Sequence, residues 1–225
     1  MKVSMSVLAP LFAFVPNTRR AAILMKRHQG QERRGPSGPQ RRLGSLSSTA
    51  RFSVDCVSLL NAQVTRELEA SQLYLSACIW CDAQNLEGMA NYMLEESKAE
   101  RGHGLNIVAF ARKRNIPLAL TPLPAPRRDW ETPLELWTDL FEAEQSNSQS
   151  LYRLADAAAE CHDHALTAFL MPYHQEQVES EAHLDRILSK VQDESRTPGM
   201  LRQLDTELGA RVHQASIGRG KQYTR

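Results

Sequence analysis

The segment Glu87–Leu105, EGMANYMLEESKAERGHGL, decides the fold because it combines a helical pattern with ionisable residues on the side that should be buried. Its inward stripe at helical spacing consists of Tyr92, Glu96, Glu100 and His103, followed by Ile107. Glu100 and His103 stand three residues apart, which places both side chains on one face of a helix. The segment therefore predicts a helix that carries a carboxylate and an imidazole into the core.

The helical sequence pattern continues on both sides of this segment. Gly and Pro are rare from about residue 53 to residue 114, whereas five prolines interrupt residues 115–133. The predicted elements are helices at residues 54–83, 87–114, 133–160 and 163–193, a short helix at about 198–210, and a polar tail at 211–225. No strand pattern is present, so the expected fold class is all-α.

The lengths of the connections predict the topology. The first and second helices, and the third and fourth, are joined by a few residues each, so each pair should form an antiparallel hairpin. The middle connection has about 18 residues and can reach about 60 Å when extended, which exceeds the roughly 40 Å length of the second helix. The expected architecture is therefore a four-helix bundle with one long crossover and a short fifth helix.

Each of the other long helices also places a polar side chain in the middle of its buried stripe: Glu67, Glu144 and Gln177. Buried carboxylates cost several kcal/mol each when they are unpaired, and no Lys or Arg lies at the same level. A cation is the remaining partner. Oxygen ligands with one imidazole suit iron or manganese better than zinc, so the pattern predicts such a metal site in mid-bundle.

The ligand set is asymmetric. Di-iron carboxylate bundles take a Glu from each of two helices and a Glu-x-x-His motif from each of the other two. Here Glu100 and His103 form one such motif, but the fourth helix offers Gln177 instead of a second. One metal would contact Glu67, Glu100 and His103, and another would contact Glu100, Glu144 and, weakly, Gln177. A weakly held second metal suits an ion that is a substrate and leaves again.

Six stretches of the chain resemble ferritin. They are 61–76 (NAQVTRELEASQLYLS), 87–105, 114–116 (RNI), 142–154, 174–178 (HQEQV) and 196–208 (RTPGMLRQLDTEL). The resemblance spans about Ser53 to Leu208 and is closest to ferritins of marine algae, including diatoms. Because the motifs fall on five predicted helices in order, the resemblance is specific.

This resemblance implies a ferritin-like bundle and an iron-storage cage of twenty-four identical subunits. The dinuclear ferroxidase site of such a cage oxidises Fe(II) to Fe(III) with dioxygen or hydrogen peroxide. Iron would be both the substrate and the stored mineral, with no organic cofactor. The matched positions are Glu67, Glu100 and His103 for the first iron, Glu100, Glu144 and Gln177 for the second, and Tyr74 near the centre.

A third iron site, which some algal and bacterial ferritins have, is matched less well. Glu96 is present for it, but Ala99 and Ser180 stand where such relatives carry carboxylates, and Glu181 is one residue out of register. We therefore expect a third iron to bind poorly near Glu96.

Two other functions fit an all-α bundle. One is a rubrerythrin-like di-iron oxidase or peroxidase that retains its metals, and the other is a helical interaction module without chemistry. The missing second Glu-x-x-His motif and the fifth helix argue against the first. Buried carboxylates at one level argue against the second.

The N-terminal segment, residues 1–52, has a different composition from the rest. Residues 1–54 carry ten Lys and Arg against Glu32 alone, a net charge of +9, while residues 55–225 carry a net charge of −8. A basic, acid-poor and Gly- and Pro-containing segment predicts a disordered transit peptide, to a plastid or alternatively to a mitochondrion. The other reading is a basic arm that stays on the mature protein. The acidic remainder, whose metal-binding domain spans about 53–210, predicts no nucleic-acid partner, and no apolar run is long enough to predict a membrane span.

The cysteines are not part of the predicted metal site. Cys78 and Cys81 form a C-x-x-C pattern inside a predicted helix, which favours packed core thiols over redox chemistry. Cys161 begins the sequence CHDH at a helix junction, where Asp163 is expected to cap the next helix.

The composition of the N-terminal leader, residues 1–52, predicts that the native protein is cleaved. Cleavage should occur at about residues 48–51, just before the first helix, because a retained arm would add nine positive charges to each subunit. Mass spectrometry of the protein from its native source measures the N-terminus, and a chain starting at Met1 would contradict cleavage. Fluorescent fusions of residues 1–54 then distinguish a plastid from a mitochondrion.

Overall fold

The computed structural model describes residues 53–193 and 199–220, with side chains described as far as residue 214. Its helices are α1 (Val54–Ala83), α2 (Glu87–Arg114), α3 (Pro133–Glu160), α4 (His164–Asp193) and α5 (Met200–Gly220). The described residues contain no strand, and the predicted all-α class is confirmed. The predicted leader lies outside the described residues. No helix in the described ranges is long and apolar enough to cross a membrane.

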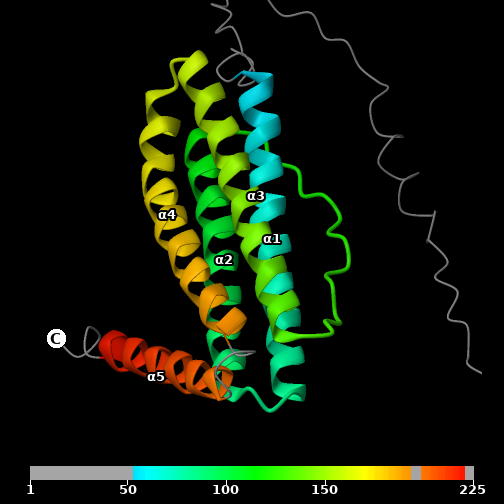
Figure 1. The fold of residues 1–225 in the computed structure, drawn as a ribbon. Helices are drawn as coiled ribbons and strands as arrows, with labels where there is room; N and C mark the ends of the chain where they lie inside the picture. The colour runs from blue at the N-terminus through cyan, green and yellow to red at the C-terminus, as the bar shows by residue number, and fades with distance from the viewer. Residues whose placement is uncertain (1–52, 194–198, 221–225) are drawn as a thin grey trace, which may run out of the picture. The chain divides into compact units, whose positions relative to one another are not determined.

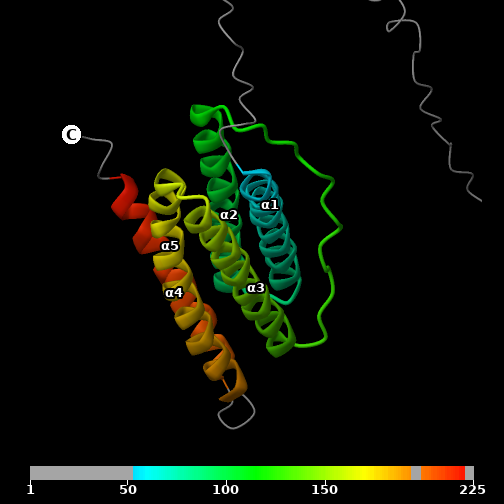
Figure 2. The same ribbon diagram turned by 90° about the horizontal axis from the view of Figure 1, so that it is seen from above.

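The four long helices form the predicted bundle of two hairpins (Figures 1 and 2). Helix α1 packs against α2 and α3, and α3 packs against α4. Residues 115–132 run along the α1 side of the bundle as the long crossover (Figure 1).

Hydrogen bonds to α1 fix the path of the crossover. The Asn61 Oδ1 accepts from the backbone N–H of Ala119 at 2.7 Å, near the start of α1. Near the other end, the Trp80 Nε1 donates to the carbonyl of Trp130 at 3.0 Å. The crossover is thereby held along most of α1, so α2 and α3 run in the same direction.

The helices begin and end where the sequence supplies caps. Ser53 and Thr132 accept from the backbone N–H groups of the first turns of α1 and α3, and Pro133 occupies the first turn of α3. Helix α2 ends at Asn115, whose φ of 58° places it in the left-handed region. Asp163 accepts from the N–H of Leu166 at 3.0 Å, so the predicted cap of α4 is present.

The interior consists of two apolar clusters separated by a polar layer. One cluster lies toward the α1–α2 turn and includes Met93 and Trp137, and the other lies toward the opposite end and includes Val64 and Leu151. The buried polar residues between them along the four helices are Gln63, Glu67, Ser97, Glu100, Glu144, Asn147, Ser148 and Gln177. Every long helix therefore contributes polar groups at one level of an otherwise apolar core.

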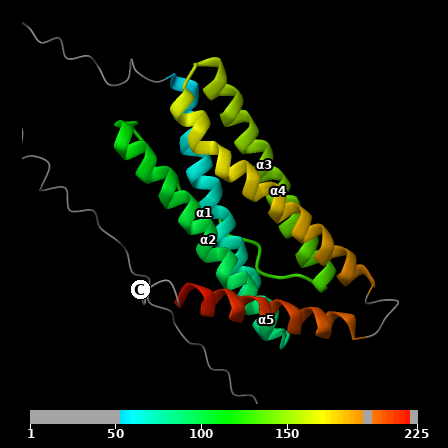
Figure 3. The same cartoon turned by 90° about the vertical axis from the view of Figure 1, so that its left-hand side faces the viewer.

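Helix α5 crosses the end of the bundle beside the start of α2 (Figure 3). Asp205 accepts from the backbone N–H of Met89 at 2.7 Å, and Leu204 and Leu208 are buried. The prediction that this helix ends near residue 210 is wrong, because it continues to Gly220. Its polar composition suggested a tail, but a polar sequence without Pro can remain helical where one face is anchored: Val212 packs on the core and Arg211 contacts the ring of His183.

Two glycines of α2 provide a test of the α2–α5 crossing. A Cβ on Gly88 would lie 1.8 Å from the carbonyl oxygen of Asp205, whereas a Cβ on Gly102 would meet nothing within 4 Å. We expect Gly88→Ala to lower the free energy of unfolding by about 1–3 kcal/mol through overpacking. The control Gly102→Ala should raise it by about 0.5–1 kcal/mol because alanine is the better helix former. Urea unfolding followed by circular dichroism measures both, and equal effects would contradict the close crossing.

Candidate metal centre

Three side chains from two helices converge in the polar layer. Glu67 comes from α1, and Glu100 and His103 come from one face of α2. One potential ligand atom from each of the three lies within 4.8 Å of the others. The His103 Nδ1 is 3.8 Å from the Glu67 Oε2 and 3.5 Å from the Glu100 Oε2. The structure therefore brings together the three residues that the sequence assigned to the first metal.

The donor set fits a cation. Glu67 is fully buried and Glu100 is 4% exposed, and the Oε2 atom of each has no hydrogen-bond partner. Buried oxygens without a partner carry the full cost of desolvation, so they mark a place where an ion or a proton belongs. Two carboxylates and an imidazole within reach of one point match the ligand preferences of iron and manganese.

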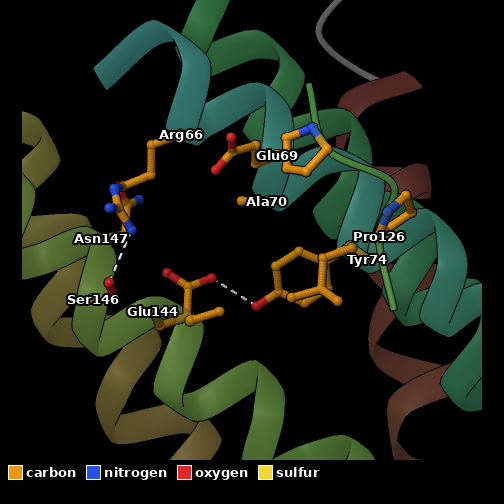
Figure 4. Close-up of a pocket in the computed structure, with 11 residues that line it drawn as sticks. Arg66, Glu69, Ala70, Tyr74, Pro126, Glu144, Ser146 and Asn147 are labelled. Atoms are coloured by element: carbon orange, nitrogen blue, oxygen red, sulfur yellow. Dashed lines mark hydrogen bonds between the residues drawn. The ribbon is translucent and has the colours of Figure 1, made fainter. Parts of the chain in front are cut away.

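Glu144 lies in the same layer, but both of its oxygens accept hydrogen bonds. The Tyr74 hydroxyl donates to its Oε1 at 2.7 Å, and the Gln177 Nε2 is 3.1 Å from its Oε2 (Figure 4 shows the first of these). Gln177 also lies 3.2 Å from the Ser148 hydroxyl. The residues assigned to the second metal thus bond to one another, whereas the residues assigned to the first leave oxygens unpaired.

Glu96 stands apart from the three converging residues. It is partly buried on α2, and burial raises the pKa of its carboxyl, although a hydrogen bond from Tyr92 opposes that shift. Glu181 is engaged by the hydroxyl of Ser148. The predicted weak third site near Glu96 stays a prediction.

Two residues of the site were missed by the sequence analysis. Gln63 is fully buried and its Nε2 lies 2.6 Å from the Glu67 Oε1 and 2.7 Å from the Asn147 Oδ1, so it fixes the orientation of the Glu67 carboxylate. Glu176, half-exposed on α4, places its Oε2 3.2 Å from the His103 Nε2. Gln63 stands one helical turn before Glu67, and this spacing could have revealed it. No sequence signal points to Glu176, because its contact with His103 depends on how α4 packs against α2.

The electrostatics of the layer favour bound protons when no metal is present. Burial raises the pKa of Glu67 to about 8, and the neighbouring charge of Glu100 adds to the shift. Burial likewise raises the pKa values of Glu100 and Glu144. For His103, burial acts to lower the pKa, but the neighbouring carboxylates of Glu100 and Glu176 outweigh burial and raise the pKa to about 11. A dication entering the layer must therefore displace protons.

A pocket of about 250 Å³ reaches this layer from the face between α1, α3 and the crossover (Figure 4). Tyr74, Glu144 and Asn147 line its inner part, while Arg66, Glu69 and Pro126 line it elsewhere. The Arg66 guanidinium donates to the Ser146 hydroxyl at 2.9 Å on its wall. Small molecules therefore have a path toward Glu144 from this face.

Comparisons with known proteins agree with the geometry. The family model described as "Ferritin-like domain" matches residues 57–193. Among curated proteins, the bacterial non-heme ferritin of Staphylococcus saprophyticus is 33% identical over 161 residues, which cover 70% of this chain and 94% of that protein. The bacterial non-heme ferritin of Staphylococcus aureus is 30% identical over 164 residues, covering 72% and 97%.

Solved structures give closer matches. The apo-ferritin from Pseudo-nitzschia multiseries is 52% identical with a TM-score of 0.66, and the match covers 68% of this chain and 98% of that one. A PmFTN variant soaked in iron matches with the same identity, coverage and TM-score.

The raised pKa of Glu67 predicts a pH dependence of the metal-free protein. Its carboxyl titrates near 4.5 when unfolded and near 8 when folded, so its contribution to stability is fully present below pH 4.5 and is lost as the pH rises to about 8. The isosteric Glu67→Gln stays neutral and keeps an oxygen for Gln63. We therefore expect it to be more stable than the native chain at pH 9 by about 3 kcal/mol, and nearly equal at pH 4.5.

Urea unfolding of chelator-treated protein across this pH range measures the effect. Glu179→Gln, at an exposed position of α4, is the control and should follow the native curve. A Glu67→Gln curve parallel to the native one would contradict the assignment of the buried proton. Adding Fe(II) without oxygen should stabilise the native chain more than the variant, because the variant lacks a ligand.

Proposed function

Because the chain belongs to the ferritin family, as a non-haem ferritin similar to that of a diatom, we propose that it stores iron and oxidises Fe(II) in the polar layer of its bundle. The observation that carries this proposal is the pair of buried, unpartnered carboxylate oxygens of Glu67 and Glu100 beside His103. An apolar core tolerates such a pair when a cation is the partner.

The proposed reaction needs two ferrous ions. Each Fe(II) gives up one electron, and dioxygen takes both electrons with two protons to form hydrogen peroxide and two Fe(III). The first ferrous ion binds to Glu67, Glu100 and His103, and the second binds between Glu100, Glu144 and Gln177. Glu100 bridges the two, and the fixed carboxylates stabilise the additional positive charge that develops on oxidation.

The second position should bind iron more weakly than the first. Glu144 must release the bonds from Tyr74 and Gln177 before it can coordinate a metal, and Gln177 must turn its amide oxygen toward the ion. It also offers no imidazole. Such a position holds an ion long enough to react and then lets the ferric product move on to the mineral, which suits storage better than a retained di-iron cofactor.

Tyr74 is placed to assist the second position. Its ring is buried and its hydroxyl touches Glu144, and burial raises the pKa of the phenol well above its usual value. The phenol therefore stays protonated and can supply a proton, or a proton with an electron, to the oxygen species formed beside it.

Assembly and location complete the proposal. The exposed apolar side chains of Leu75 and Ile79 on α1 are 44% and 66% exposed, which supports burial between subunits of a cage of twenty-four copies. Residues 1–52 are proposed to direct the chain to a plastid, on the basis of their charge. The Gln at position 177 leaves the rubrerythrin-like alternative without its second histidine motif.

Three variants test the oxidation proposal. Glu100→Ala removes the bridge and should lower the initial rate of Fe(II) oxidation in air by at least about 100-fold. Gln177→Ala should lower it by about 10-fold, because it weakens the second position alone. The control Glu179→Ala, at an exposed position of α4, should retain the native rate. Stopped-flow absorbance measures the rates, with gel filtration to establish that each variant assembles, and a native rate in assembled Glu100→Ala would overturn the assignment.

A further inference from the structure

Two cysteines far from the metal layer meet at the other end of the bundle. Cys56 lies in the first turn of α1 and Cys161 is the residue that ends α3, and they are 105 residues apart in sequence. Their sulfur atoms are 3.6 Å apart, with the Cys56 thiol donating to the Cys161 sulfur. Cys56 is 5% exposed, while Cys161 is exposed.

The turn that carries Cys161 is held in place. Arg114, at the end of α2, donates to both carboxylate oxygens of Asp163 at 2.8 Å. Asp163 also caps α4. His162, which lies between Cys161 and Asp163, adopts a φ of 52°. The two sulfurs are therefore kept close by the fold and not by a flexible loop.

The surroundings give the two thiols different roles. Burial raises the pKa of Cys56 to about 11, and the Cys161 sulfur beside it adds to the shift. Cys56 thus stays protonated and can donate its S–H to the neighbouring sulfur of Cys161. Because Cys161 is exposed, its sulfur is the one that an oxidant reaches first, and the buried Cys56 thiol is the one that resolves the oxidised sulfur.

We propose that Cys56 and Cys161 form a peroxide-reducing dithiol site, which a hydroperoxide converts into a disulfide between α1 and the α3–α4 turn. The Cys161 thiolate attacks one peroxide oxygen, the O–O bond breaks, and the second oxygen leaves as water after it takes a proton. The Cys56 thiol then attacks the sulfenic acid on Cys161, forms the S–S bond and releases a second water. Two thiols lose two electrons and two protons, and one hydrogen peroxide becomes two waters.

The source of the peroxide connects this site to the iron chemistry, and that connection rests on the proposed function. Oxidation of two Fe(II) by dioxygen yields one hydrogen peroxide, which is the amount that one dithiol reduces. The dithiol would remove this product before it meets further Fe(II). Reaction with added hydrogen peroxide does not depend on the iron site.

Helix α1, which carries Cys56, also carries two cysteines that serve as an internal control. Cys78 and Cys81 are both buried, and burial raises the pKa values of both thiols, that of Cys81 to about 12. They should remain reduced under conditions that oxidise the other pair.

The first experiment uses the assembled, reduced, iron-free protein with equimolar hydrogen peroxide. After denaturation and alkylation, the free thiols should fall from the four in the sequence to two, and peptide mapping should show a Cys56–Cys161 link within one chain. Cys161→Ser should slow thiol loss by at least about tenfold. Cys56→Ser should still react but stop at oxidised Cys161 without the link. Unchanged thiols, a Cys78–Cys81 link, or links only between chains would each overturn the proposal.

The second experiment replaces the peroxide by Fe(II) in air and compares the native chain with Glu100→Ala. If the link forms with added peroxide in both proteins but with Fe(II) only in the native one, the dithiol acts downstream of iron oxidation. If added peroxide forms the link and Fe(II) does not in the native chain, the dithiol stands and its supply by the proposed iron oxidation is overturned. If added peroxide fails, the dithiol proposal falls while the rates of iron oxidation remain a separate measurement.

Discussion

The burial of three carboxylates in one layer between two apolar clusters is the constraint on which the rest of the structure depends. Glu67, Glu100 and Glu144 come from three different helices, and a rotation or shift of any one helix would move its carboxylate out of the layer. Their burial is unfavourable unless protons or cations compensate it. The layer of buried carboxylates therefore destabilises the fold when it holds no proton or cation, and this cost is removed when a positive charge binds.

The arrangement of the neighbours explains why the compensation is uneven. Gln63, whose amide also donates to Asn147, donates to one oxygen of Glu67 and leaves the other without a partner, so this carboxylate is oriented toward an incoming ion. Glu144 is satisfied on both oxygens by Tyr74 and Gln177, so it gains less from a metal. In the proposed function, the Glu67 half with its unpartnered oxygen and the Glu144 half with both oxygens hydrogen-bonded would hold two ions with different strengths. In that proposal, the weaker position releases its ion to the mineral, whereas a tighter position would retain it.

Much of this could be predicted from the sequence because the signals are local. The spacing of Glu100 and His103, the proline-rich crossover and the caps of the helices depend on residues a few positions apart. The register that brings Glu67 to Glu100 was also correct, since the apolar stripes fix which faces meet.

Glu176 was missed because its contact with His103 depends on the packing of α4. The pairing of Cys56 with Cys161 was missed for a similar reason, since it joins a helix start to a turn that only the assembled bundle brings close. The end of α5 was misjudged because polar composition does not reveal anchoring by Val212.

The bond between Asp205 and the N–H of Met89 has a consequence for synthesis of the chain. Leu86 offers no side-chain cap to the start of α2, so this helix takes its cap from a residue 116 positions later. At about 5–20 residues per second, a ribosome needs on the order of ten seconds to make that interval. During this time the start of α2 lacks both this hydrogen bond and the packing of α5 against Gly88. The first hairpin therefore reaches its full stability only after α5 has been made.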